Sequence, residues 1–231
     1  MDGRARAAWG QGARSLTLAE PSSAARLVPF FPTHVIAEPW PAFEAHAGAL
    51  RDAILARRAA DPDETPRWSS GTDLPDWGGE AARALCAHVQ ARIDAMTVDK
   101  AQDGDRRRFR WAATLWADLL TRHGAIDLHA FPGTSWTAIC CIDDGYGGDA
   151  DPMLGGELVF LDPRYPEVRT RTPELRTRRQ DGSADQHEVR LRAASGQIVM
   201  FPSWLMHGVR PFGGGGSRIS IAMTFRADRL R

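Results

Sequence analysis

The sequence predicts an α+β domain in which two helices support a β-sandwich or barrel. Two segments with the apolar spacing of helices come first along the chain, and a series of short strand-like segments follows. Clusters of Gly, Pro and Asp separate these later segments, which is typical of turns between strands. Because helices and strands occupy different parts of the sequence, we expect helices packed along one side of a β-structure rather than alternating β-α-β units.

Each predicted helix has one apolar face, because its apolar residues recur every three or four positions. These residues are Phe43, Ala47, Leu50 and Ile54 in the first helix, and Leu85, Val89, Ile93 and Met96 in the second. The segment between them, residues 63–78, is rich in turn-forming residues and contains two tryptophans. A polar, arginine-rich break at residues 99–108 follows the second helix.

The strand-like segments are enriched in Val, Ile, Trp and Phe, which favour β-structure. They cover residues 109–119, 136–142, 157–161, 188–191, 197–201 and 219–225. The arginine-rich segment 164–192 is long for a connection, and a solvated hairpin is the simplest interpretation; a substrate clamp is the alternative. By composition, residues 1–26 form a flexible N-terminal extension, and a length of 231 residues suits a single domain over residues 27–231.

The balance of charges excludes some classes of partner. The chain has 29 basic and 29 acidic residues, so its net charge indicates neither nucleic acid nor an anionic membrane surface as a partner. No run of apolar residues is long enough to span a membrane. The three cysteines have no metal-binding spacing, and free thiols fit a reducing compartment, so we expect a cytoplasmic protein of unspecified oligomeric state.

The strongest chemical signal lies near the C-terminal end, where His207 precedes Arg218 and Ser220. Arg218 and Ser220 are two residues apart in a strand-like segment, so their side chains project from the same face. A guanidinium matches a carboxylate through two hydrogen bonds, and imidazole is a common ligand of non-haem iron. Taken alone, each residue also fits an ordinary core or surface role. Together, and with His129 upstream, they predict an iron site beside a clamp for a dicarboxylate.

Four motifs extend this signal over much of the chain. They are Trp68-Ser-x-x-x-Asp73-Leu, His129-x-x-Pro-Gly-x-x-Trp-Thr, Gly155-Gly-Glu-Leu-Val-Phe-Leu-Asp-Pro-Arg164 and Gly196-x-Ile-Val-Met-Phe-Pro-Ser-Trp-x-x-His207, the last followed by Arg218-Ile-Ser-Ile-Ala. In these motifs the sequence resembles the 2-oxoglutarate- and Fe(II)-dependent oxygenases related to prolyl hydroxylases. The C-terminal motif is specific for that family, whereas the N-terminal half of the chain carries little of the resemblance.

The resemblance implies a double-stranded β-helix, a cupin-like jelly roll, with supporting N-terminal helices. It implies a hydroxylase that uses Fe(II), 2-oxoglutarate as co-substrate and O2, and that acts on a peptide side chain or a small metabolite. His129 and His207 match the metal ligands, and Arg218, assisted by Ser220, matches the clamp for the distal carboxylate of 2-oxoglutarate. Thr137 matches a position that lines the co-substrate pocket. No catalytic side chain is implied beyond the metal ligands.

The sequence departs from the family at Phe131, where the resemblance implies a third ligand two residues after His129. A phenylalanine cannot bind a metal, so the usual set of two histidines and one carboxylate is incomplete. Asp127, two residues before His129, is a candidate for the missing carboxylate, although a turn residue there is an equally good interpretation. Alternatively, two histidines leave a position open for water or halide, as in halogenases, or the metal site has been lost and the domain only binds ligands.

Overall fold

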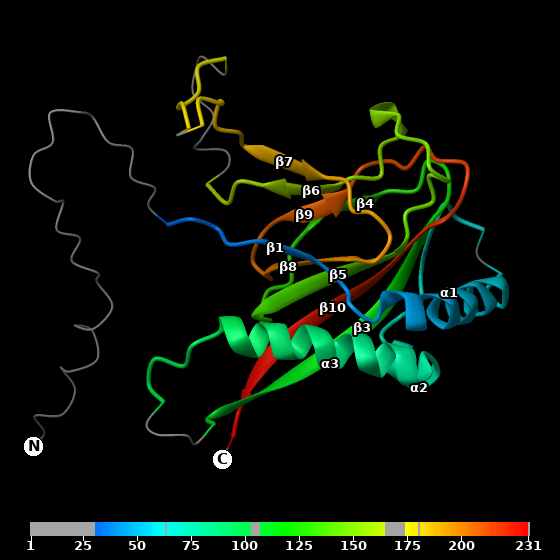
Figure 1. Cartoon of the computed structure of the whole chain (residues 1–231), viewed down its shortest axis with the longest axis horizontal. Helices are drawn as coiled ribbons and strands as arrows, with labels where there is room; N and C mark the ends of the chain where they lie inside the picture. Colours follow the sequence, from blue (N-terminus) through cyan, green and yellow to red (C-terminus); the bar gives the residue numbers. More distant parts are fainter. Residues whose placement is uncertain (1–30, 63, 103–106, 165–173, 180, 231) are drawn as a thin grey trace, which may run out of the picture.

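The computed structural model describes residues 31–62, 64–102, 107–164, 174–179 and 181–230. Two antiparallel sheets face each other and form the double-stranded β-helix that the resemblance implies (Figure 1). The larger sheet has the strand order β1-β8-β5-β10-β3-β2, and the smaller has the order β4-β9-β6-β7. The strands of the larger sheet are β1 (Ile36–Pro39), β2 (Arg67–Ser69), β3 (Phe109–Leu120), β5 (Trp136–Asp143), β8 (Gln197–Pro202) and β10 (Arg218–Arg229). Those of the smaller sheet are β4 (Ile126–His129), β6 (Leu158–Leu161), β7 (Glu188–Leu191) and β9 (His207–Val209).

The helices cover the outer face of the larger sheet (Figure 1). They are α1 (Phe43–Ala59), the short α2 (Leu74–Trp77) and α3 (Gly79–Met96), and a single 3-10 turn spans Pro152–Leu154. Leu50 and Ile54 of α1 and Leu85, Val89 and Ile93 of α3 are buried. The two predicted helices and their apolar faces are therefore confirmed, except that Met96 at the end of α3 is exposed.

Strand β10 contributes side chains both to the core beneath the helices and to the space between the two sheets. Ile219, Ile221 and Met223 point toward the helices and belong to the larger core, whereas Ser220 and Ala222 line a cavity between the sheets. The alternation follows from the pleat of a strand, which sends successive side chains to opposite faces. A second apolar cluster, which includes Phe201 and Phe212, fills part of the space between the sheets. The cavity therefore lies in a layer that the helices do not reach.

The long strands agree with the sequence patterns. The predicted segments 109–119, 136–142, 188–191, 197–201 and 219–225 lie within β3, β5, β7, β8 and β10, and β6 begins one residue after the predicted start at residue 157. The strands β1, β2, β4 and β9 were not predicted. The segment 163–192 contains β7 and an antiparallel bridge between Arg178 and Ala184, and the rest of it lies partly outside the described residues.

The predicted extension, residues 1–26, lies wholly outside the residues that the structure describes. Within the described ranges, no helix combines the length and the apolar character that a membrane span requires.

Candidate metal and carboxylate site

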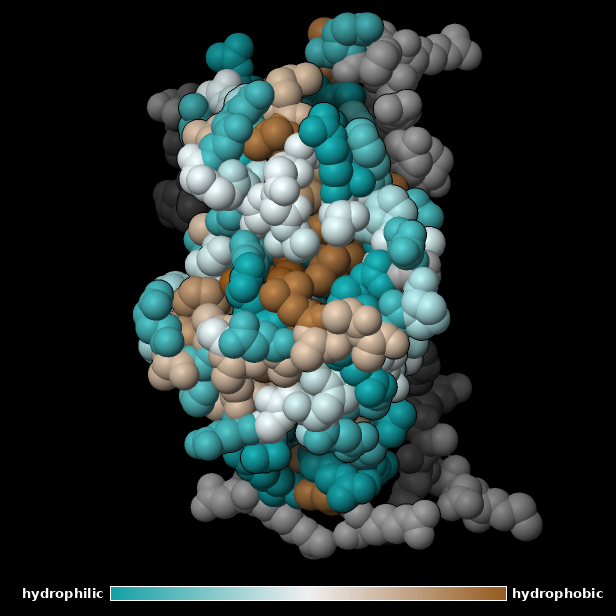
Figure 2. All heavy atoms as spheres, turned by 90° about the vertical axis from the view of Figure 1, so that its right-hand side faces the viewer, coloured by the Kyte–Doolittle hydropathy of each residue, from teal (hydrophilic) through white to brown (hydrophobic). Residues whose placement is uncertain are grey.

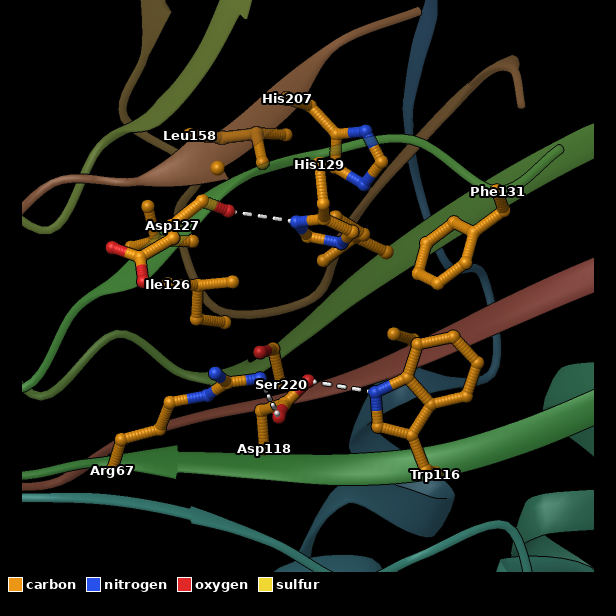
Figure 3. Close-up of a pocket in the computed structure, with 14 residues that line it drawn as sticks. Arg67, Trp116, Asp118, Ile126, Asp127, His129, Phe131, Leu158, His207 and Ser220 are labelled. Carbon is orange, nitrogen blue, oxygen red and sulfur yellow. Dashed lines mark hydrogen bonds and ion pairs between the residues drawn. The ribbon is translucent and has the colours of Figure 1, made fainter. Parts of the chain in front are cut away.

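A cavity of about 390 Å³ separates the two sheets and holds most of the predicted site residues. Its polar lining comes from both sheets, and apolar side chains such as Ile126, Ile139 and Leu158 form the walls between. Figure 2 shows that the face on the right of Figure 1 is hollowed across its middle, with apolar side chains in the hollow and polar ones around it. Figure 3 shows two polar ends in the cavity, one with the histidines and one with Arg67, Asp118 and Ser220.

His129 and His207 form the first polar end. They are direct partners in the pairing of β4 with β9, and their ring centroids are 4.3 Å apart. The close approach of the strands requires Gly208, because a Cβ at that position would lie 2.6 Å from the backbone oxygen of Ile126. The sequence therefore brings together two histidines that are 78 positions apart, on strands of only three or four residues.

The hydrogen bonds of both imidazoles leave the same nitrogen available. Nδ1 of His129 lies 2.8 Å from the carbonyl oxygen of Asp127, and Nδ1 of His207 lies 2.9 Å from that of Leu205. A carbonyl only accepts, so in the neutral imidazoles Nδ1 carries the proton and Nε2 keeps its lone pair. Burial lowers the pKa of His207 to about 4, and the neighbouring His129 acts in the same direction. His207 is therefore neutral near physiological pH, as a metal ligand must be.

Phe131 occupies the space beside the two histidines. Its ring centroid lies 4.9 Å from that of His129 and 5.6 Å from that of His207, and its other side meets Trp116 edge to face at 5.4 Å. The ring therefore fills with hydrocarbon the place beside the histidines in which the resemblance implies a third ligand. Within the described ranges, no cluster of three His, Cys, Asp or Glu side chains suited to a metal ion is present.

Asp127 contacts His129 through its backbone and not through its carboxylate. The residue is exposed, and Figure 3 shows its carboxylate turned away from the two imidazoles. In this conformation it fixes the tautomer of His129 and supplies no third ligand. Its role as a ligand stays a prediction, which a substitution can test.

Arg218 and Ser220 lie at the other end of the site, on the inner face of β10. Both are 2% exposed, and a nitrogen of the Arg218 guanidinium donates a hydrogen bond of 3.2 Å to Ser220 Oγ. Gly145, with φ of 72°, lets the loop after β5 pass the start of β10, since a Cβ there would lie 2.8 Å from the backbone nitrogen of Arg218. No carboxylate of the described residues forms an ion pair with Arg218. A buried guanidinium without an anion is costly, so this arrangement suits an anionic ligand.

Thr137, which the resemblance assigns to the co-substrate pocket, and Cys141 are both buried residues of β5. Thr137 is fully buried, its hydroxyl lies 2.8 Å from Ser203 Oγ, and it is not among the residues that line the cavity. Cys141 stands opposite Ser220 in the pairing of β5 with β10, and burial raises the pKa of its thiol to about 11. Cys141 is therefore a neutral, small apolar neighbour of the arginine, as expected for a buried thiol.

Two charged residues that were not predicted from the sequence line the cavity, Arg67 on β2 and Asp118 on β3. Asp118 stands opposite Ser220 in the pairing of β3 with β10. A signal for Asp118 was present, because it is the single charged residue in the apolar run from Trp111 to Leu120. Arg67 carried no comparable signal, since it lies in a turn-rich segment where arginines are usually solvated.

Comparisons with known proteins give one family match and a shared fold. Residues 114–224 match a family model described as "Putative 2OG-Fe(II) oxygenase". This range includes His129, His207, Arg218 and Ser220. No curated protein matches the sequence.

Several solved structures share the fold. A prolyl hydroxylase from Trichoplax adhaerens, in complex with a peptide fragment of hypoxia inducible factor, has a TM-score of 0.56 at 12% identity and covers 83% of each chain. HygX from Streptomyces hygroscopicus, with nickel and 2-oxoglutarate bound, has a TM-score of 0.56 at 14% identity over 84% of this chain and 83% of its own. A prolyl-4-hydroxylase from Pseudomonas putida gives 0.50 at 18% identity over 84% and 92%. Residues 114–224 of the chain are therefore similar to the 2-oxoglutarate- and Fe(II)-dependent oxygenases, and the chain shares its fold with the prolyl hydroxylases among the solved structures.

Proposed function

We propose that the protein is a 2-oxoglutarate- and Fe(II)-dependent hydroxylase. The observation that carries the proposal is that one cavity is lined both by two imidazoles with free Nε2 atoms and by Ser220. Ser220 accepts a hydrogen bond from Arg218, a buried arginine that forms no ion pair among the described residues. In this proposal His129 and His207 hold the metal, and Arg218 with Ser220 holds the distal carboxylate of 2-oxoglutarate. Fe(II) and 2-oxoglutarate, when bound, would supply the activation of O2 for oxidation of a C–H bond.

The residues present fit these groups in part. The two imidazoles fit a first-row metal, whose other positions 2-oxoglutarate and O2 or water would occupy. The third protein ligand is missing from the described residues, because Phe131 is apolar and the Asp127 carboxylate points away. The protein's own contribution is to fix both histidine tautomers, to present one positive charge at the far end and to keep water from the apolar walls.

The substrate class follows from the size and lining of the cavity. A volume of about 390 Å³ is near the lower end of the range for small-molecule pockets, and 2-oxoglutarate would fill part of it. The cavity therefore has room for a side chain of a peptide or for part of a small metabolite, and we propose a substrate of one of these two kinds.

The cysteines of the described residues, Cys86, Cys140 and Cys141, are free, which supports a cytoplasmic location.

Succinate formation tests the proposal. The purified protein is incubated with 2-oxoglutarate, Fe(II), ascorbate and O2, and we expect succinate to form at a rate that falls to background in the Arg218→Gln variant. A matched control is Arg57→Gln, because Arg57 is a half-exposed arginine paired with Asp73 at the surface. If the wild type neither formed succinate nor bound the metal, the proposed enzymatic activity would be contradicted.

A second candidate is a binding module that uses the same cavity without catalysis. Phe131 favours it, because its ring takes the place of a ligand and packs tightly against both histidines and Trp116. Binding of 2-oxoglutarate with no turnover, under conditions in which the metal is bound, would support this candidate over the oxygenase.

A further inference from the structure

The end of the cavity opposite the histidines holds a carboxylate with an unused oxygen. Asp118 is 4% exposed, and its Oδ2 accepts a hydrogen bond of 2.9 Å from Nε1 of Trp116. Its Oδ1 is buried and has no hydrogen-bond partner. A buried carboxylate oxygen without a donor is costly, so an arrangement that leaves one requires a physical reason.

Arg67 is the cation that lies nearest to this oxygen. Its guanidinium reaches over the floor of the cavity toward Asp118 and Ser220, and its terminal nitrogen is 4.0 Å from Asp118 Oδ1 (Figure 3). This separation is too long for a hydrogen bond. The Arg67 side chain is 48% exposed, so it is free to move by the ångström or so that would close the contact. The charges of Arg67 and Asp118 therefore attract each other, but the two side chains form no hydrogen bond.

Two cations share one carboxylate at this end of the cavity. Arg67 and Arg218 both act on the pKa of Asp118, so both guanidinium groups lie near it. Among the described residues Arg218 forms no ion pair, and Arg67 approaches Asp118 only to 4.0 Å. Arg67 lines the cavity directly, whereas Arg218 reaches it through Ser220, which does line it. A single carboxylate placed here would balance the charge and meet donors from both arginines.

We propose that Arg67, oriented by Asp118, is a second carboxylate-binding residue for the distal end of 2-oxoglutarate. The inference rests on the proposed function of the cavity. Binding of the ligand draws Arg67 inward, one N–H of the guanidinium closes onto Asp118 Oδ1, and another faces the ligand carboxylate from the side opposite Arg218. Arg67 is then a binding residue, and Asp118 is a positioning residue that acts through it.

Ligand binding without turnover tests this role. Dissociation constants are measured by calorimetry, with Ni(II) in place of Fe(II), for 2-oxoglutarate and for 2-oxopentanoate, which lacks the distal carboxylate. We expect Arg67→Gln to weaken 2-oxoglutarate about tenfold, since one charge-assisted hydrogen bond is lost, and to leave 2-oxopentanoate unchanged. Arg67→Lys should recover part of the loss, because the charge returns without the forked geometry.

Asp118→Asn and a surface control complete the design. We expect Asp118→Asn to weaken 2-oxoglutarate by a smaller factor, again without effect on 2-oxopentanoate, because only the orientation of Arg67 changes. Arg57→Gln, at an arginine of similar exposure that does not line the cavity, should leave both constants unchanged.

Two results would overturn the assignment of Arg67 while leaving the proposed function intact. One is an unchanged affinity of Arg67→Gln for 2-oxoglutarate. The other is an equal loss for both ligands, which would place the effect on the fold or on the 2-oxoacid end. Failure of the wild type to bind either ligand is a different result, and it would remove the proposed function together with this inference.

Discussion

His129 and His207 face each other across the pairing of β4 with β9, and each donates its Nδ1 proton to the carbonyl oxygen of the residue two positions earlier in the chain. The two imidazoles therefore have the same local geometry although they come from different strands. With ring centroids 4.3 Å apart, both Nε2 atoms are available on the cavity side of the smaller sheet. This arrangement makes the histidine pair the basis of the predictions about metal binding.

Removal of either histidine should abolish most metal binding. We expect His129→Ala and His207→Ala each to lower the affinity for Ni(II) or Co(II) by about a hundredfold or more. Removal of a direct ligand should cost more affinity than removal of a group that only hydrogen-bonds to a ligand. Calorimetry on the metal-free protein measures the affinity. His34→Ala is the control, since His34 is exposed and outside the cavity. Wild-type affinity in either variant would contradict the assignment.

Replacement of Phe131 by a ligand should raise the affinity for metal. In Phe131→Asp, a carboxylate takes the place of a ring that contacts both imidazoles, so it completes the set of two histidines and one carboxylate. We expect affinity for Co(II) to rise about tenfold or more, with a change in the visible spectrum that reports the new ligand. Phe131→Leu, which removes the ring without adding a ligand, should show neither effect. Equal affinities in the two variants would mean that this position does not face the metal.

Substitution of Asp127 separates its backbone role from its carboxylate role. The hydrogen bond to His129 uses the carbonyl oxygen, which alanine keeps, and the carboxylate points away from the cavity's histidines. We therefore expect Asp127→Ala to bind metal with an affinity within about twofold of the wild type. Substitution of a side chain that hydrogen-bonds to a metal ligand typically lowers the metal affinity by more than this. A loss as large as that in His129→Ala would show instead that the carboxylate turns inward and serves as the third ligand.

Much of the fold was predictable because its largest elements have long periodic patterns. The apolar spacing of α1 and α3 and the alternation along β10 extend over many residues, so the pattern stands out from chance. The strands β1, β2, β4 and β9 have only three or four residues. Length alone is not the reason, because β6 and β7 also have four residues and were predicted. The four missed strands each contain a residue typical of turns, namely Pro39, Ser69, Asp127 or Gly208, so tertiary pairing rather than local preference makes these segments strands.

The candidate site was predictable only where a motif accompanied it. His207, Arg218 and Ser220 lie in a family-specific segment, and His129 lies in a second one. Asp118 and Arg67 join them through strand pairing, since Asp118 stands opposite Ser220 and Arg67 opposite Leu120. Register between strands distant in sequence cannot be derived from composition or spacing, and the unused oxygen of Asp118 is a property of three-dimensional packing alone.

Asp118 should lower the stability of the protein near neutral pH. Burial raises the pKa of Asp118, against the opposing effects of Arg67, of the hydrogen bond from Trp116 and of the nearby Ser69 hydroxyl, so the folded state holds a proton at a pH where the unfolded chain has lost it. Stability from this group is therefore fully present below the ordinary aspartate pKa, about 4, and is lost as pH rises through that value to the raised one.

The variant Asp118→Asn carries no such charge. We expect its free energy of unfolding to exceed that of the wild type by about 1 kcal/mol near neutral pH, and the difference to shrink as pH falls below about 4. Urea unfolding at several pH values measures it. Asp162→Asn is a control of opposite sign, because hydrogen bonds from Arg164 lower the pKa of Asp162, and that variant should be less stable near neutral pH. If Asp118→Asn proved less stable than the wild type at neutral pH, Asp118 would be a structural residue. A gain in stability together with weaker binding of 2-oxoglutarate would instead show that the carboxylate is kept for the ligand at a cost to the fold.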